Sequence, residues 1–365
     1  MAKVLTVIGA RPQFIKASAV SRAMANSNIL DEVILHTGQH FDAKMSQIFF
    51  DEMGIPKPAY NLNINNVSHA AMTAAMMTGI EQVVLDERPD YVLVYGDTNS
   101  TLAGALVAAK LHIPVIHVEA GLRSGNMNMP EEVNRILTDR ISSLLFCTSQ
   151  HGVDNLNKEG FDQFDSQVVA VGDVMMDSAL YYGKAVLDKH FDYPEQFILL
   201  TMHRAENTDN PQRLESLVRA INRVSNTLPV VVPLHPRTQA VMDKCALAFS
   251  ANVNVVSPVG YLEMLWLIQR ALFVMTDSGG LQKDAYYFQK YCLTLRDETE
   301  WVELVKHGCN LLTGTDTQAV VATANLLLNK QWDDNIPQDI YGNGRASTSL
   351  VKIMENHSLK QNRNP

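Results

Sequence analysis

The segment YVLVYGDTNSTLAGALVAAKLHIPVIHVEAG (residues 91–121) places two short apolar runs on either side of a helix-length stretch. The runs at 91–97 and 115–120 are rich in valine, leucine and isoleucine without polar alternation, which is typical of strands buried on both faces of a parallel sheet. Residues 101–111 between them have the length and spacing of an amphipathic helix. This order of strand, helix and strand predicts a βαβ unit.

The same alternation continues in both directions along the chain. Further helix-length stretches occur at 16–24, 70–85, 131–143, 211–227 and 281–288. Apolar runs of strand length occur six times in each half, at 4–9, 33–38, 91–97, 115–120, 144–149 and 168–173, and then at 197–203, 229–235, 253–258, 272–277, 291–296 and 310–314. We therefore predict an α/β protein with two Rossmann-like, doubly wound parallel-sheet domains.

The predicted seam between the domains follows the sixth strand. We expect an N-terminal domain over residues 1–170 and a C-terminal domain over residues 171–346. The segment 347–358 has the length of a final helix, with Ser347 as its N-cap, and we expect it to pack back on the N-terminal domain. Open parallel sheets bind ligands at the carboxyl ends of their strands, and the polar segments of this chain follow its predicted strands directly. The sequence thus predicts an active site in the cleft between two domains.

Composition and charge exclude several classes of protein. The 365 residues carry a formal net charge of −9, so general binding to nucleic acid is not expected. The N-terminus MAKVLTVIGARP is too short in apolar residues for a signal peptide, and no run reaches the ~18 apolar residues of a membrane span, so we expect a cytoplasmic protein with no membrane contact. The four cysteines form no CxxC pair and are expected to be reduced.

Two segments have the chemistry of phosphate sites. In DSGGLQKDAYYF (277–288), a strand ends and Ser278, Gly279 and Gly280 open a helix whose free N–H groups attract an anion. Asp284, two turns further on, is placed to reach a ribose hydroxyl. The alternative is a tight turn with Ser278 as a helix cap. In GARPQFIK (9–16), Arg11 and Lys16 follow a strand and suit a diphosphate, the alternative being two solvated cations.

Two further segments place a histidine with an arginine after a strand. MHRAEN contains His203 and Arg204, and PLHPRT contains His235. Histidine donates to phosphate or titrates near neutral pH, although either residue alone is more often a structural hydrogen-bonding group. Their equivalent positions after two strands favour function.

Three carboxylates are the candidates for chemistry. Asp97 ends one predicted strand, Glu119 ends the next, and Glu131 begins a helix. Carboxylates clustered in a closed cleft raise one another's pKa and separate acid from base roles. The alternatives are helix caps or salt bridges, for example between Glu131 and Arg135. His117-x-Glu119 lacks the downstream P-C-x-x-C of zinc deaminases, and no P-loop, GxSxG or HExxH motif is present, so we expect no metal site.

The motifs and their order resemble the bacterial UDP-N-acetylglucosamine 2-epimerases. The matching strings run from about residue 3 to residue 355 and are GARPQFIKA (9–17), GDTNSTLAG (96–104), HVEAGLRSG (117–125), PEEVNR (130–135), HRAEN (203–207), HPRT (235–238), DSGGLQKDA (277–285), RDETE (296–300) and YGNGRAS (341–347). The resemblance implies a GT-B-like pair of domains and an isomerase that inverts C2 of a UDP-linked 2-acetamido sugar. The product of such an isomerase is a precursor of surface polysaccharide. It also implies a homodimer and no cofactor.

In this family the C2 proton is removed, UDP leaves by anti elimination, and a 2-acetamidoglucal forms before UDP adds back. The resemblance gives Asp97, Glu119 and Glu131 the role of catalytic carboxylates without deciding which removes the proton. It places His203 in the active site. It assigns to the UDP-sugar Arg11, Lys16, Ser278, Gly279, Gly280, Asp284 and Glu300, and we expect Arg204 and His235 to bind it as well.

Three departures from the family pattern bear on the substrate. The family usually has Glu at Asp284, and its TERPE string is TEWVE here (299–303). The second change resembles the branch acting on UDP-2,3-diacetamido-2,3-dideoxyglucuronate. Ala75 stands where several members have an arginine for a second, activating UDP-sugar. The remaining alternatives are a hydrolysing epimerase, a GT-B glycosyltransferase and a silent UDP-sugar sensor.

Overall fold

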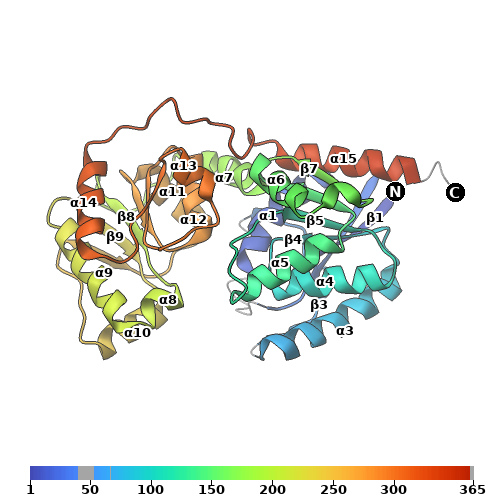
Figure 1. Cartoon of the computed structure of the whole chain (residues 1–365), viewed down its shortest axis with the longest axis horizontal. Coiled ribbons are helices and arrows are strands. Elements are labelled where there is room, and N and C mark those ends of the chain that lie inside the picture. The colour runs from blue at the N-terminus through green and yellow to red at the C-terminus, as the bar shows by residue number, and fades with distance from the viewer. Residues whose placement is uncertain (40–52, 66, 362–365) are drawn as a thin grey trace. The chain divides into compact units, whose positions relative to one another are not determined.

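The computed structural model describes residues 1–39, 53–65 and 67–361 and divides the chain into two compact units (Figure 1). Unit 1 comprises Met1–Ser178 with Gln338–Pro365, and unit 2 comprises Ala179–Pro337. Each unit has one sheet of parallel strands with its own helices, so the α/β class predicted from the sequence is confirmed.

Unit 1 contains a seven-stranded sheet in the order β3-β2-β1-β4-β5-β6-β7. All of its strand pairs are parallel. The strands β2 and β3 lie on one side of β1, and the later strands β4 to β7 lie on the other side, so the strand order switches between β1 and β4. The carboxyl ends of the strands on either side of such a switch point form the usual ligand-binding edge. The strands are β1 (Ala2–Ile8), β2 (Leu30–His36), β3 (Tyr60–Asn61), β4 (Tyr91–Tyr95), β5 (Val115–Ala120), β6 (Leu144–Cys147) and β7 (Gln167–Ala170).

Helices pack on this sheet through alternate residues of its strands. Leu5 and Val7 of β1 belong to one buried cluster with residues of α3 (His69–Glu87) and α4 (Asn99–Lys110). The last helix, α15 (Ala346–Gln361), packs on α1 (Arg11–Met24), and Tyr91 Oη lies 2.9 Å from His357 Nδ1 of α15. The other helices of this unit are α5 (Pro130–Arg140), α6 (Gln150–Lys158), the 3₁₀ turn η1 (Phe161–Gln163) and α7 (Val174–Ala185), which extends into unit 2.

A partly buried carboxyl group on β2 makes the stability of unit 1 depend on pH. Burial raises the pKa of Glu32 from 4.5 to about 7, although the 2.6 Å hydrogen bond from Thr6 Oγ1 opposes the rise. The folded chain therefore keeps a proton that the unfolded chain releases, so this stability is complete below pH 4.5 and is lost as pH rises toward 7.

We expect Glu32→Gln, which retains an acceptor for Thr6, to remove this dependence. The difference in unfolding free energy between variant and wild type should grow in the variant's favour by up to about 3 kcal/mol between pH 4 and pH 8. Urea unfolding at both pH values measures it. A difference that stays constant with pH would show that Glu32 does not retain its proton.

Unit 2 contains a six-stranded parallel sheet in the order β10-β9-β8-β11-β12-β13. Its strands are β8 (Ile198–Thr201), β9 (Val230–Pro233), β10 (Val253–Val256), β11 (Val274–Thr276), β12 (Cys292–Thr294) and β13 (Asn310–Leu312). Its helices are α8 (Ala205–Thr208), α9 (Pro211–Val224), α10 (Pro236–Lys244), α11 (Tyr261–Arg270), α12 (Gly279–Tyr287), α13 (Val302–Lys306) and α14 (Thr317–Leu328). The strand order again switches between β8 and β11, which are neighbours in the sheet although β9 and β10 separate them in the sequence.

The two units meet at Ser178 and Ala179, and unit 1 resumes at Gln338, whereas the expected seam was at 170/171 and the expected end of the C-terminal domain at 346. Asp173 N–H donates to Tyr341 O (2.8 Å), and Asp177 accepts from the N–H groups of Ala346 (3.0 Å) and Ser347 (2.7 Å). These bonds join the start of α7 to the C-terminal segment within unit 1. They also correct the expected cap, because α15 begins at Ala346 and Asp177 from another segment satisfies its first N–H groups.

Candidate active site

The carboxyl ends of β4 and β5 bring two of the predicted carboxylates into one cluster. Asp97 follows β4 after Gly96, whose φ of +63° few other residues adopt. Glu119 lies in β5 with φ +74°, and the pairing of β5 with β6 shifts register between Val118 and Ala120. This bulge turns the Glu119 side chain out of the regular alternation of the strand.

The Glu119 carboxylate pairs with Lys16 of α1. Lys16 Nζ lies 2.5 Å from Glu119 Oε1, and both side chains are buried. The pair lies directly above Gly96, because a Cβ added to Gly96 would come within 3.1 Å of Lys16 Nζ and 3.2 Å of Glu119 Oε1. The absence of a side chain at Gly96 therefore leaves room for the ion pair of Lys16 and Glu119. Lys16, which we expected at a diphosphate, here neutralises a carboxylate.

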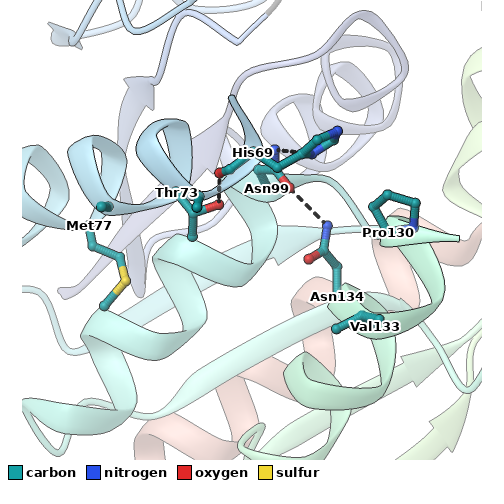
Figure 2. A pocket seen from close by; sticks show the side chains of 9 residues that line it. His69, Thr73, Met77, Asn99, Pro130, Val133 and Asn134 are labelled. Carbon is teal, nitrogen blue, oxygen red and sulfur yellow. Dashed lines mark hydrogen bonds between the residues drawn. The ribbon is translucent and has the colours of Figure 1, made fainter. Parts of the chain in front are cut away.

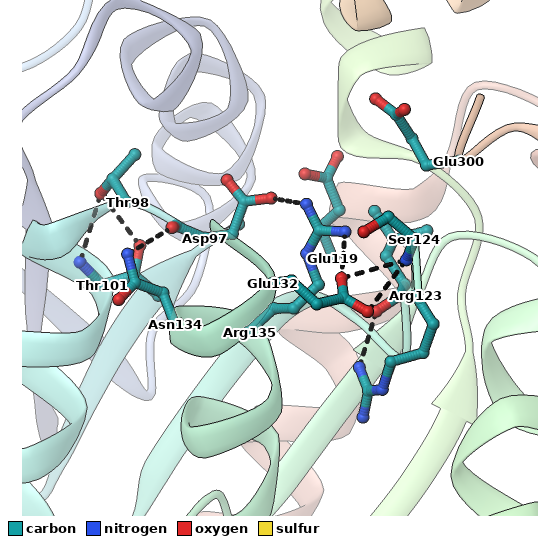
Figure 3. Close-up of polar contacts among 12 residues, drawn as sticks. Asp97, Thr98, Thr101, Glu119, Arg123, Ser124, Glu132, Asn134, Arg135 and Glu300 are labelled. Atoms are coloured by element: carbon teal, nitrogen blue, oxygen red, sulfur yellow. Dashed lines mark hydrogen bonds and ion pairs between the residues drawn. The ribbon is translucent and has the colours of Figure 1, made fainter. Parts of the chain in front are cut away.

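The Asp97 carboxylate pairs with Arg135 of α5 (Figure 3). Arg135 Nη2 lies 2.5 Å from Asp97 Oδ2, and its Nη1 lies 2.8 Å from Glu132 Oε2. Enclosure by protein atoms raises the pKa of Asp97, Arg135 and Lys16 oppose the rise, and the charge of Glu119 adds to it. Asp97 and Glu119 thus influence each other and stand in different surroundings, as required of a pair that divides acid and base roles.

The third predicted carboxylate, Glu131, is exposed on the first turn of α5. Its neighbour Glu132 is buried instead and accepts hydrogen bonds from Ser124 N–H (3.0 Å) and Gly125 N–H (2.9 Å) as well as from Arg135. Glu132, Arg135 and Asp139 share a face of α5 at helical spacing, and all three are buried. The sequence reasoning missed this face, although the spacing of these three polar residues, which is that of the buried face of a helix, could have indicated it.

A pocket of about 470 Å³ adjoins the cluster in unit 1 (Figure 2). It is lined by α3, the start of α4 and the start of α5, with mostly apolar walls. Asn134 joins it to the carboxylates, since its Nδ2 donates to Asp97 O (2.9 Å) and lies 3.3 Å from Asn99 Oδ1. Asn99 Nδ2 in turn lies 3.1 Å from His69 Nδ1.

In unit 2, one buried carboxylate organises the segment that contains the predicted histidine. Asp277, at the end of β11, accepts from the backbone N–H groups of His203 (3.1 Å) and Arg204 (3.0 Å). His203 Nδ1 lies 3.4 Å from Asp277 Oδ1, and half of the histidine side chain is exposed. Partial enclosure of the ring lowers the pKa of His203, Asp277 opposes this, and Arg204 and His235 add to it. His203 is therefore favoured in its neutral form.

The start of α12 has the features of an anion site. Ser278 is its N-cap without a side-chain bond to the helix, so the first N–H groups of α12 remain for other acceptors. A Cβ at Gly279 would lie 2.4 Å from Glu300 Oε1 and 3.7 Å from Arg204 Nη2, which places both charged groups at this turn. Burial opposes ionisation of Glu300, but Arg296 (3.0 Å) and Arg204 together lower its pKa.

The family model for UDP-N-acetylglucosamine 2-epimerase matches residues 22–355. A UDP-2,3-diacetamido-2,3-dideoxy-D-glucuronate 2-epimerase from Pseudomonas aeruginosa is 54% identical over 354 residues, which cover 96% of this chain and 99% of that protein. This chain belongs to the UDP-N-acetylglucosamine 2-epimerase family. The predicted family and the suspected branch are thereby supported, and the chain is an enzyme of a family of isomerases.

Other members of the epimerase family agree over the whole length. The UDP-N-acetylglucosamine 2-epimerase of Escherichia coli K12 is 31% identical, with 98% of this chain and 99% of that protein covered. The UDP-GlcNAc 2-epimerase of Methanocaldococcus jannaschii, solved with UDP-GlcNAc and UDP, is 39% identical with a TM-score of 0.89, covering 97% of this chain and 99% of that one. The enzyme of Neisseria meningitidis bound to UDP-GlcNAc has 29% identity and a TM-score of 0.88, with 97% and 100% covered. These matches confirm the GT-B-like fold class.

Three of the remaining residues expected at the epimerase site lie at the ends of elements, and the fourth, Asp284, lies inside α12. Arg11 is the first residue of α1, directly after β1. His235 is the N-cap of α10 and accepts from Arg237 N–H through Nδ1 (3.2 Å). Gly280 is exposed in the first turn of α12, whereas Asp284 is buried on the same helix.

Neither a metal site nor a membrane-spanning helix is found among the residues that the structure describes. Among them, no cluster of three or more His, Cys, Asp or Glu side chains has the arrangement of a metal site. Within the same ranges, no helix is long and apolar enough to cross a lipid bilayer.

Proposed function

We propose that this chain is a non-hydrolysing 2-epimerase of a UDP-linked 2-acetamido sugar, of the type that makes precursors of surface polysaccharide. The observation that supports it best is the pair of carboxylates at the ends of β4 and β5. Asp97 and Glu119 influence each other's charge, and each has its own cation, Arg135 and Lys16 respectively. Proton removal on one face of a carbon and proton return on the other require two such groups.

In the proposed reaction, one carboxylate takes the C2 proton and the C1–O bond to the β-phosphate breaks. The electron pair of the C2–H bond forms the C1=C2 double bond of a 2-acetamidoglucal, and the C1–O pair departs with UDP. Re-addition of UDP to C1 and of a proton to the other face of C2 gives the epimer. Asp97, Glu119 and the exposed Glu131 are the candidate acids and bases, with His203 assisting. No cofactor is needed for this sequence.

Unit 2 is proposed to hold the nucleotide. The N–H groups at the start of α12 and the guanidinium of Arg204 suit the diphosphate, because backbone donors and a cation meet at one helix end. Ser278, Gly279, Gly280 and His235 are assigned to the phosphates, and Glu300 and Asp284 to the ribose and its surroundings. Arg11 and Lys16 of unit 1 are also assigned to the diphosphate. Lys16 would then exchange its bond to Glu119 for a bond to a phosphate oxygen.

A methyl group at the first glycine of α12 should weaken nucleotide binding. At Gly279 the added Cβ would lie 2.4 Å from Glu300 Oε1, so that side chain must move from the turn. We expect Gly279→Ala to lower UDP affinity at least about tenfold, or about 1.4 kcal/mol. At Gly280 an added Cβ meets no atom within 4 Å, so Gly280→Ala should lower affinity less. Titration calorimetry with UDP compares them, and equal effects would remove Glu300 from the proposed site.

Within this reaction, we propose UDP-2,3-diacetamido-2,3-dideoxyglucuronate as the preferred substrate. The support is the 54% identity to the epimerase named for that sugar nucleotide, against 31% to the UDP-N-acetylglucosamine 2-epimerase of E. coli K12, over nearly complete chains in both cases. UDP-N-acetylglucosamine is the alternative.

Purified enzyme should be assayed with each sugar nucleotide, with its manno-type epimer as the product. A kcat/KM at least about tenfold higher for the diacetamido-glucuronate supports the assignment, a ratio of 1.4 kcal/mol in transition-state binding. Equal or reversed preference would return the assignment to UDP-N-acetylglucosamine. Release of free N-acetylmannosamine would indicate a hydrolysing enzyme, and a requirement for an acceptor sugar would indicate a glycosyltransferase.

A homodimer in the cytoplasm completes the proposal. Both features rest on the family resemblance, and sedimentation analysis of the purified enzyme tests the first.

A further inference from the structure

His117 and Asp139 form a fully buried pair that contacts the backbone on both sides of the carboxylate cluster. His117 lies in β5 two residues before Glu119, and Asp139 lies in the last turns of α5. The ring Nδ1 of His117 is 2.6 Å from Asp139 Oδ1, and its Nε2 is 2.7 Å from the carbonyl oxygen of Gly96. Both side chains are 0% exposed.

The partners of the ring on its two sides differ in chemistry. A carbonyl oxygen only accepts, so Nε2 carries a proton. The second oxygen of Asp139 accepts from Gly121 N–H (3.1 Å) and from Arg123 Nη1 (2.7 Å), which is the environment of an ionised carboxylate. Nδ1 faces Oδ1, so the ring bridges the carboxyl group of Asp139 and the carbonyl group of Gly96.

Asp139 contacts the chain on both sides of the strained residue Glu119. Through His117 it reaches the residue two positions before, and through Gly121 N–H the residue two positions after. The left-handed φ of Glu119, +74°, is unfavourable for a residue with a long side chain and persists only where surrounding contacts enforce it. Asp139 provides such contacts.

His117 extends the same connection to the other carboxylate. Gly96, whose carbonyl accepts from Nε2, directly precedes Asp97, and its own N–H donates to Val118 O (2.9 Å). The backbone of Gly96 is thus bonded to β5 on both of its polar groups. One buried pair joins the turn before Asp97 to the bulge that contains Glu119.

We propose that His117 and Asp139 are positioning residues that set the separation of Asp97 and Glu119. The inference rests on the proposed function, because that separation matters only if the two carboxylates share one substrate carbon. Catalysis is sensitive to it, since a displacement of ~1 Å costs about 10²-fold in rate. A pair that serves stability alone is the alternative.

Two matched pairs of variants separate the alternatives. The amide of His117→Gln can occupy the place of Nε2 and donate to Gly96 O, whereas that of His117→Asn lies near Nδ1 and loses this bond. Asp139→Asn can accept from Gly121 N–H and Arg123 while donating to a neutral His117, whereas Asp139→Ala loses every contact. We expect His117→Asn and Asp139→Ala to lower kcat about 10²-fold with KM within about threefold, and the two conservative variants to keep kcat within about tenfold.

Activity is compared with thermal stability, UDP affinity and crystal structures of the variants. Positioning predicts that kcat depends on the retained hydrogen bonds, that UDP affinity is unchanged, and that Glu119 leaves its left-handed φ in His117→Asn. The proposal would be overturned if kcat followed the melting temperature and were equal in His117→Asn and His117→Gln. It would also be overturned if Glu119 and Gly96 had not moved in the crystal structure of His117→Asn. If the wild-type enzyme converts neither sugar nucleotide, the proposed function fails, and the crystal structures still decide whether the pair positions the backbone.

Discussion

Glu119→Gln should lower kcat by at least about 10²-fold, the usual contribution of a general acid or base. The amide has the shape of the carboxylate but takes up no proton. Glu119 is only 7% exposed, and Lys16 lies 2.5 Å from it, so solvent does not readily substitute for the lost group. Affinity for UDP should persist, because its proposed site lies mainly in unit 2.

The same change at Glu87 provides the control. Glu87 pairs with Lys3 (2.7 Å) near the start of β1, at the edge of the sheet opposite to the carboxylate cluster. Glu87→Gln should leave kcat within about twofold, since removal of such a partly exposed pair changes stability by about 1 kcal/mol or less. Normal turnover in Glu119→Gln would remove the elimination mechanism as assigned here.

Gly121→Ala should destabilise unit 1 by about 2–5 kcal/mol. Gly121 follows Glu119 by two residues and has φ +78°, where a side chain is strained. Its Cβ would also lie 2.4 Å from the carbonyl oxygen of Gly152 in α6, and backbone at a helix start yields little. Strain and overlap therefore add, and the bulge at Glu119 would shift with them.

Gly160→Ala isolates the strain from the overlap. Gly160 has φ +80°, but a Cβ there meets no atom within 4 Å. Its replacement should cost about 1 kcal/mol. Urea unfolding of both variants gives the comparison, and equal free energies would show that α6 does not pack closely against Gly121 as described.

Most of the fold was predictable because buried parallel strands are uninterrupted apolar runs. Each of the twelve predicted runs overlaps an observed strand, and the run 115–120 coincides with β5. The strand β3 was missed, since Tyr60–Asn61 has no apolar run and owes its pairing to β2. Helix α1 begins at Arg11 rather than near Lys16, because the Gln13 side chain accepts from Gly9 (2.8 Å) and Ala10 (3.0 Å) N–H groups.

The site was predictable in position but not in its contacts. The strand ends indicate that Asp97 and Glu119 lie near each other, and β4 and β5 are neighbours in the sheet. Which of Glu131 and Glu132 faces inward depends on the rotation of α5, which its packing against α4 determines. The bulge at Glu119 and the pair His117–Asp139 depend on contacts between distant segments, and local sequence does not specify these.

In the proposed reaction, two carboxylates of unit 1 exchange the proton at C2 of a UDP-sugar. Proton NMR of the wild-type enzyme in D₂O, with UDP-2,3-diacetamido-2,3-dideoxyglucuronate and then with UDP-N-acetylglucosamine, tests it most directly. We expect a new manno-type epimer of at least one of them with deuterium at C2, and no such signal in Glu119→Gln. Retention of the C2 proton in both sugar nucleotides would contradict it.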